Sequence, residues 1–146
     1  MSVLEKELVV SDLNFEFNKK DAVTDLTKEF GQQFSISKSV REQHTDTTTI
    51  HPSKLPDGVV FAENEIDVKK TVEICQKYKC PIIPFGVGSS LEGHVNALYG
   101  AISIDLNNMN KILHVSPEDG YAIVQPGVTR EPVSYTHLTL PTTPYV

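Results

Sequence analysis

The sequence predicts an α+β fold in which a strand-helix-strand unit is followed by mostly antiparallel strands and preceded by a helical N-terminal segment. Three observations support this class. Two short apolar runs, at residues 59–62 and 81–85, enclose a segment with helical periodicity. Three more strand-like runs follow, separated by short turns that contain Asn or Gly. The 146 residues, 39% hydrophobic and 22% charged, match the composition of one ordinary globular domain.

The first third of the chain is polar and helix-prone. Asp21 is a candidate N-cap, and Gly31 is placed to end the helix that follows. The apolar positions of this helix follow helical spacing at Val23, Leu26 and Phe30. A second short helix is expected after the candidate N-cap Ser37. The run TTTIHPSKLPDG then contains two prolines and a closing Asp-Gly, which predicts an extended connector, a turn and a boundary after residue 56.

A βαβ unit is predicted next. The run 59–62 is typical of a strand buried on both faces, and Asn64 is a candidate N-cap for the helix after it. This helix has an apolar face expected to consist of Val68, Val72 and Cys75, with Ile66 at its start. Its charged side chains are expected to face water at Lys69, Lys70, Glu73 and Lys77. The run PIIPF at 81–85 forms the second strand, parallel to the first.

Three further strands are expected at residues 101–106, 111–116 and 121–125. The turns between them, LNNMN and PEDG, are short, so these strands should be mostly antiparallel neighbours.

Composition excludes several classes of partner. The formal net charge of -6 and the sequence pI near 5.3 leave no basic stripe for nucleic acid. No secretory or transit signal is present at the start, and no stretch approaches the roughly 20 apolar residues of a membrane helix. We therefore expect a cytoplasmic location and no transmembrane segment. The spacing of Cys75 and Cys80 matches neither a redox pair nor a zinc site, which predicts buried, inert thiols. His51 and His114 are isolated, so no metal site is expected.

The run GVGSSLEGHVN directly after the second strand carries the most specific functional pattern. Glycines let backbone N–H groups converge on an anion, and two serine hydroxyls can donate to the same oxygens. The G-x-x-x-x-G spacing suggests a Walker loop, but His94 and Val95 stand where Lys and Ser or Thr are required. The Rossmann pattern fails because Leu91 takes the place of its third glycine and a strand follows. The alternatives are an anion-binding loop at a strand's carboxyl end and a simple flexible connector.

Four runs follow one another between residues 38 and 131: VREQH, PDGVVFAENEIDVKKTVEICQKYKCPIIPFGVGSSLEGH, ISIDLNNMNKIL and SPEDGYAIVQPGVTRE. In this order they resemble the N-terminal half of a PCMH-type FAD-binding domain of the vanillyl-alcohol-oxidase-like flavoproteins. Within that superfamily the sequence is most similar to the FAD-linked oxidases of the D-lactate dehydrogenase (cytochrome) and glycolate oxidase group.

The resemblance implies FAD as the cofactor and assigns a set of binding positions. The strand-to-loop segment wraps the pyrophosphate mainly with main-chain amides, and a later segment lies near the cofactor. The first segment comprises Pro84, Phe85, Gly86, Val87, Gly88, Ser89, Ser90, Leu91 and Gly93, and the later one contributes Gly127. His94 stands where many relatives have a second glycine. The pattern assigns no chemical role to VREQH, for which a surface or interdomain salt-bridge cluster is the simpler interpretation.

The resemblance also implies a longer parent that oxidises a small 2-hydroxy acid by hydride transfer from C2 to flavin N5. We expect an N-terminal helical segment at 1–56, the first lobe of the FAD-binding domain at 57–131, and a tail at 132–146. The tail has no Asp, Glu, Lys or Arg, and we expect it to be non-native; the alternative is a genuine disordered terminus. No catalytic base is identifiable, so we expect the chain alone to be inactive. The competing hypotheses are a non-catalytic phosphate-binding module and an inert fragment.

Overall fold

A four-stranded sheet in the order β1-β2-β4-β3 forms the centre of the fold. The computed structural model describes residues 17–49 and 52–129. Strands β2, β4 and β3 run parallel, and β1 pairs antiparallel with β2 at one edge. The strand bounds are β1 Phe34–Ser35, β2 Gly58–Phe61, β3 Ile82–Phe85 and β4 Ile102–Asp105. The predicted α+β class is therefore confirmed.

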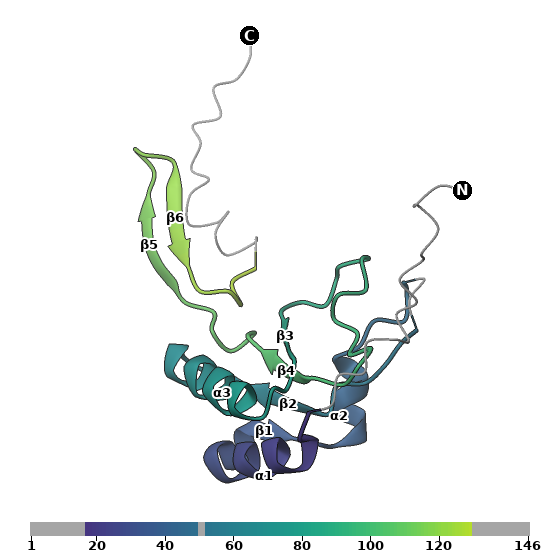
Figure 1. The fold of residues 1–146 in the computed structure, drawn as a ribbon. Coiled ribbons are helices and arrows are strands. Elements are labelled where there is room, and N and C mark those ends of the chain that lie inside the picture. Colours follow the sequence, from purple (N-terminus) through teal and green to yellow (C-terminus); the bar gives the residue numbers. More distant parts are fainter. Residues whose placement is uncertain (1–16, 50–51, 130–146) are drawn as a thin grey trace, which may run out of the picture.

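Two helices lie on one face of the sheet, and a separate hairpin extends away from them (Figure 1). The two helices are α1 (Lys19–Phe30) and α3 (Glu65–Lys77). The 3-10 turn η2 (Gly31–Gln33) and the short helix α2 (Lys38–Gln43) lie on either side of β1 in sequence. The hairpin consists of β5 (Ile112–Ser116) and β6 (Tyr121–Val124), which pair antiparallel as predicted. In the described ranges, no helix has both the length and the hydrophobicity that a membrane crossing requires.

The prediction that the strand at residues 101–106 pairs antiparallel with the strands after it is wrong. This segment forms β4, which lies between β2 and β3 and is parallel to both. All four of its residues are buried, as expected for the central strand of a parallel arrangement. The connection 86–101 carries the chain back to the opposite end of the sheet, as parallel pairing requires. The predicted strands at 59–62 and 81–85 are parallel, but β4 separates them.

Helix α1 begins one turn earlier than predicted. Asn18, not Asp21, is its N-cap, and the Asn18 side chain accepts a hydrogen bond from the Asp21 N–H. Gly31 ends the helix with a φ of 52°, as predicted. The buried positions of this helix are Ala22, Leu26 and Phe30, with Val23 only partly buried.

The predicted apolar face of α3 is partly wrong. Asn64 caps the helix as expected, but Val72 and Ile66 are exposed, and Thr71 is fully buried beside Cys75. Thr71 tolerates burial because its hydroxyl donates to the Asp67 carbonyl at 2.8 Å. The four charged side chains predicted to face water are exposed: Lys69, Lys70, Glu73 and Lys77.

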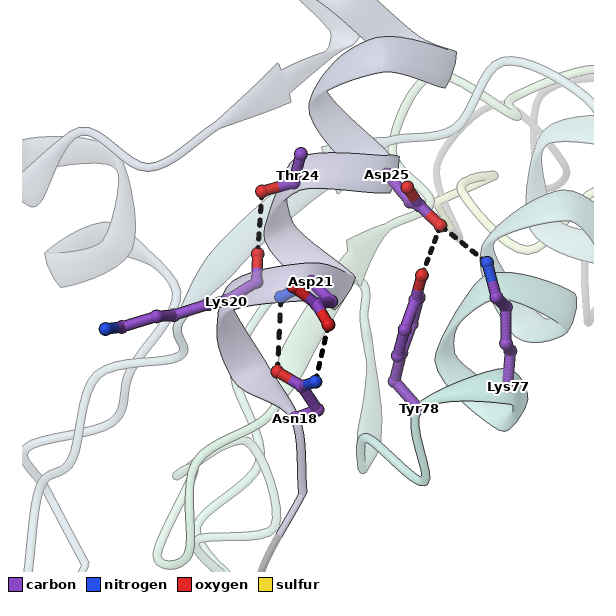
Figure 2. A network of polar contacts seen from close by, with 7 residues as sticks. All are labelled: Asn18, Lys20, Asp21, Thr24, Asp25, Lys77 and Tyr78. Atoms are coloured by element: carbon purple, nitrogen blue, oxygen red, sulfur yellow. Dashed lines mark hydrogen bonds and ion pairs between the residues drawn. The ribbon is translucent and has the colours of Figure 1, made fainter.

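Polar contacts join α1 to α3 above a common core. The Asp25 carboxylate accepts hydrogen bonds from Lys77 at 2.9 Å and from the Tyr78 hydroxyl at 2.5 Å, as Figure 2 shows. Glu29 pairs with Lys70 farther along the same helices. The core beneath them joins residues on both sides of position 56: Ala22, Leu26, Phe30, Phe34, Val60, Cys75, Cys80 and Ile102. The division at 56 and 131 remains a prediction, and the tail 132–146 lies outside the described residues.

Candidate functional site

The carboxyl ends of the three parallel strands meet at one edge of the sheet. Phe61 of β2, Asp105 of β4 and Phe85 of β3 are aligned in register. Alternation along the strands places these side chains on the face opposite α1 and α3, because the core residues Val60 and Ile104 point to the helices. The glycine loop begins directly after Phe85, so it starts where open α/β sheets place their ligands.

The loop presents backbone donors that the protein does not use. In the described ranges, the N–H groups of residues 87–91 have no hydrogen-bond partner. Gly88 and Gly93 have φ values of 70° and 72°, a left-handed conformation that favours glycine. Ser90 accepts a hydrogen bond from the Glu92 N–H at 3.3 Å, and Ser89 is exposed. Val87 and Leu91 are 70% and 73% exposed. These features fit a loop that wraps an anionic ligand with its amides.

The two first glycines of the loop have different structural roles. A Cβ atom added to Gly86 would meet nothing within 4 Å, so the backbone there faces open space. A Cβ added to Gly88 would lie 2.7 Å from Cζ of Phe85. Glycine is therefore required at position 88 by packing against Phe85, whereas Gly86 leaves room for a ligand to approach the backbone. The open space beside the Gly86 backbone and the unpaired amides after it are compatible with a bound pyrophosphate.

Gly127 lies at the same edge of the sheet and packs tightly against backbone. A Cβ there would lie 2.7 Å from the Asn107 carbonyl oxygen, and the Gly127 N–H donates to the Met109 carbonyl at 2.8 Å. The Asn107 side chain in turn donates to the Gly86 carbonyl at 2.9 Å. Asn107 therefore links the two sequence-predicted segments. The structure brings Gly86 and Gly127 next to the same residue, Asn107, which the sequence prediction did not include.

A buried ion pair lies beneath the loop. His44 and Asp105 are 4% and 7% exposed, and Nε2 of His44 is 2.8 Å from Oδ2 of Asp105. Nδ1 of His44 donates to the Val40 carbonyl at 2.8 Å, and the Phe61 and Phe85 rings contact the imidazole. The interpretation of VREQH as a surface or interdomain cluster is thus wrong for His44. Its neighbour Arg41 donates to the Pro56 carbonyl.

The pKa shifts of this pair agree with an imidazolium-carboxylate contact. Burial lowers the pKa of His44, but the hydrogen bonds to Asp105 and to the Val40 carbonyl outweigh burial and raise it. Burial also raises the pKa of Asp105, yet donation from His44 and from the Asn107 N–H brings it below its usual value. Both shifts favour the charged forms. The sequence pattern assigned no role to His44, because its partner Asp105 lies 61 residues later in the chain. The available signal was an acidic residue at the end of a buried strand.

A second contact fixes the far end of the loop. The buried Asn96 side chain accepts from the Asp46 N–H at 2.8 Å and donates to the Asp46 carbonyl at 3.0 Å. Thr45 donates to the same amide oxygen at 2.6 Å. The loop is therefore held at Gly86 by Asn107 and beyond Gly93 by the segment after α2.

A separate concavity of about 450 Å³ lies at the other end of β3 and β4. Pro81 and Ala101, which precede the two strands, line it together with Leu98 and Tyr99. It does not include the loop residues 86–93. The predicted site and this concavity are therefore distinct places.

Neither cysteine nor histidine side chains form a metal site among the described residues. Cys75 and Cys80 are both free and buried, as predicted. Contact with Cys80 and burial raise the pKa of the Cys75 thiol, which disfavours the reactive thiolate. His114 lies on the exposed hairpin, and His51 lies outside the described residues.

Within residues 17–49 and 52–129, the chain forms an α+β domain in which a glycine loop with unpaired amides follows one of three parallel strands. The chain belongs to the FAD binding domain family, whose match covers residues 56–137. FAD is the cofactor of this domain. The match extends into the segment 132–146 that was expected to be non-native, and the nature of that tail stays a prediction.

Named relatives of this chain include a dehydrogenase and an oxidase component. The chain is 41% identical to the probable mitochondrial D-lactate dehydrogenase of Danio rerio over 97 residues, which cover 66% of this chain and 20% of that protein. It is 30% identical to the glycolate oxidase component GlcD of Bacillus subtilis, covering 66% of this chain and 21% of the relative. The chain thus spans about a fifth of these relatives. The predicted group is confirmed, whereas the cytoplasmic location is not, because the Danio rerio relative is named mitochondrial.

Solved structures confirm the partial PCMH-type fold. A crystal structure of p-cresol methylhydroxylase with substrate bound superposes with a TM-score of 0.67 at 26% identity, covering 75% of this chain and 22% of that one. Alkyldihydroxyacetonephosphate synthase gives a TM-score of 0.69 at 25% identity, with coverages of 80% and 24%.

Proposed function

We propose that this chain is the FAD-binding N-terminal part of a flavin-dependent 2-hydroxy-acid dehydrogenase that acts on D-lactate or glycolate. The observation that carries the proposal is the loop 86–93, which presents unpaired amides at the carboxyl edge of three parallel strands. The relatives named as a D-lactate dehydrogenase and as part of a glycolate oxidase support the substrate class. In the full-length parent, the flavin accepts a hydride at N5 from C2 of the hydroxy acid.

The residues of the loop bind the pyrophosphate through main-chain donors. The N–H groups of residues 87–91 face no protein acceptor among the described residues, and the Ser89 and Ser90 hydroxyls add further donors. Neutral amides held in a fixed loop stabilise phosphate charge without the reorganisation that water requires. Pro84 and Phe85 end β3 and set where the loop begins, whereas Gly127 packs against the backbone of Asn107.

The chemistry also requires a base for the substrate hydroxyl proton. No residue of the chain is assigned this role, and His44 has both ring nitrogens engaged. Oxidation of a hydroxy acid needs the base and the flavin to be aligned on one substrate. We therefore expect the 146-residue chain to bind FAD weakly and to show no dehydrogenase activity.

The test is an FAD titration of the isotope-labelled chain, followed by NMR of the backbone amides. We expect the largest shifts at residues 87–91 and no retention of flavin through purification. Gly86→Asp should abolish these shifts, because it places a carboxylate in the open space that the pyrophosphate approaches. The substitution should not strain the fold, since a Cβ at Gly86 meets nothing within 4 Å. Gln76→Glu adds the same charge on the exposed surface of α3 and should leave them unchanged. Shifts confined to other elements would contradict the loop assignment, and stoichiometric flavin in the purified chain would contradict the expected weak binding.

A further inference from the structure

We propose that His44, Asp105 and Asn107 form a positioning device that holds the first turn of the FAD loop in its binding conformation. The proposal rests on the function proposed above for residues 86–93 and assigns a role to three residues outside that loop. None of the three is expected to contact the reacting atoms. Each is a positioning residue that acts through the Gly86 carbonyl.

A continuous chain of hydrogen bonds links helix α2 to the loop. His44 donates from Nδ1 to the Val40 carbonyl at 2.8 Å and from Nε2 to Oδ2 of Asp105 at 2.8 Å. The other Asp105 oxygen accepts from the Asn107 N–H at 2.8 Å. The Asn107 side chain then donates to the Gly86 carbonyl at 2.9 Å. The position of Gly86 is thereby coupled to a buried ion pair.

The charge on His44 has a geometric cause. Both ring nitrogens face acceptors, so both must carry a proton for the two hydrogen bonds to form. Asp105 is the charged group of β4 that faces the imidazole, and β2 and β3 contribute the aromatic rings of Phe61 and Phe85. On α2, the Arg41 guanidinium is turned to the Pro56 carbonyl, and Glu42 pairs with Lys38. The titration of His44 is therefore governed mainly by Asp105.

Holding Gly86 matters because the loop is rich in glycine. Glycine has more conformational freedom to lose than any other residue, so ordering such a loop on binding weakens affinity. The Asn107 contact orders the first loop residue before the ligand arrives. When the imidazolium of His44 loses a proton, one of its two hydrogen bonds is lost, and an unprotonated ring nitrogen then faces an acceptor oxygen. This repulsion loosens the Asp105 end of the hydrogen-bond chain.

Two matched variants test the device without disturbing the buried pair. Asn107→Ala removes the donor to Gly86, and Asn108→Ala makes the same change at an exposed neighbour. In the full chain, we expect Asn107→Ala to lower the NMR order parameters of the Gly86–Gly88 amides and to weaken FAD binding by about five- to tenfold, the effect of one hydrogen bond. Asn108→Ala should match the wild type. Equal order parameters and equal FAD affinities in the two variants would overturn the proposal.

A pH profile separates positioning from general stability. FAD affinity of the wild-type chain should fall as the pH rises through the pKa of His44, and His44→Gln should remove this step. His94 is exposed on the same loop, so the pH profile of His94→Gln is measured in parallel. A fall in FAD affinity that remains in His94→Gln is the one assigned to His44. A step that persists in His44→Gln contradicts the proposal. If His44→Gln does not fold, the comparison of Asn107→Ala with Asn108→Ala decides whether the positioning role holds.

The two proposals fail in different ways. If FAD causes no shifts in the loop of the wild-type chain, the loop assignment fails, while the order parameters of the Gly86–Gly88 amides in Asn107→Ala still decide the positioning role. If FAD binds at the loop with the same affinity in Asn107→Ala and Asn108→Ala, the loop assignment stands and the positioning role is excluded.

Discussion

At the scale of single residues, the most deeply buried ion pair of the described structure is that of His44 and Asp105. Each group is buried, and each is stabilised in its charged form by the other. A buried pair costs desolvation when it forms, yet removing one partner leaves an uncompensated charge and costs about 3–5 kcal/mol. The pair therefore makes the stability of the fold sensitive to pH.

Stability should be highest between the ordinary pKa values of the two groups. The pKa of His44 is raised, so its contribution is complete below its unfolded value of 6.5 and is lost as pH rises through the folded value. The pKa of Asp105 is lowered, so its contribution is present above 3.8 and is lost as pH falls through the folded value. Urea unfolding at several pH values should therefore show a decline in the free energy of unfolding above about pH 6.5.

The matched control for this prediction is the exposed His114. His44→Gln should flatten the decline on the alkaline side, whereas His114→Gln should leave it as in the wild type. A decline of equal size in both variants would show that another group causes it.

The two cysteines should be chemically silent in the folded chain. Contact with Cys80 together with burial raises the pKa of Cys75, whereas contact with Cys75 lowers the pKa of Cys80. Both thiols are buried, and burial is what keeps a reagent away from Cys80. A thiol reagent such as DTNB should label neither residue in the native protein and both in urea. Val87→Cys places a thiol at a position 70% exposed in the loop and should react at once. Rapid labelling of Cys75 or Cys80 without urea would contradict the expectation.

At the scale of elements, α1 is bound to the sheet by a small set of side chains. Leu26 is fully buried in the core shared with β2, β4 and α3, while Asp25 and Glu29 contact α3 at the surface. Surface ion pairs contribute little, because solvent screens them and their side chains lose entropy. Burial of the apolar face of α1 is therefore the main attachment of this helix.

Leu26→Ala should cost about 3 kcal/mol of unfolding free energy, because it leaves a cavity in a packed core. Ile66 is a matched control, since it is 64% exposed at the start of α3 and was wrongly expected to be buried. Ile66→Ala should change stability by less than about 1 kcal/mol. Urea unfolding of the two variants measures both values, and similar losses would contradict the assignment of the core.

At the scale of the whole molecule, the described structure has one layered core and one exposed hairpin. All four residues of β6 are exposed, including apolar Tyr121 and Ile123, and Leu113 of β5 is 60% exposed. Isolated two-stranded hairpins are marginally stable in water. Stability is therefore concentrated in the sheet and its two helices.

Hydrogen exchange should separate these two parts. Amides of β5 and β6 should exchange at least about tenfold faster than those of β2 and β4, because few buried contacts oppose local opening of the hairpin. The central strand β4 is the internal reference, since all of its residues are buried. Equal protection in the hairpin and in β4 would show that the hairpin belongs to the same cooperative unit.

Local elements and the glycine-rich loop after β3 could be predicted from the order of residues alone. Caps at Asn64 and Gly31, the helix between two apolar runs, and the glycines after PIIPF are short-range patterns, so they could be read directly. The family resemblance, carried by motifs in a fixed order, was confirmed by the match over 56–137. Misplaced details were also local: Asn18 rather than Asp21 is the N-cap of α1, and Thr71 rather than Val72 is buried.

The surroundings of the loop, by contrast, depend on long-range packing. Insertion of β4 between β2 and β3 requires parallel pairing of distant segments, and a short apolar run carries no signal of its neighbours. That insertion brings Asp105 to the carboxyl edge, where His44, 61 residues earlier in the chain, can pair with it. A single sequence states which residues follow one another, whereas the sheet order sets which charges share a buried space. The loop could be predicted from the sequence, but its support could not.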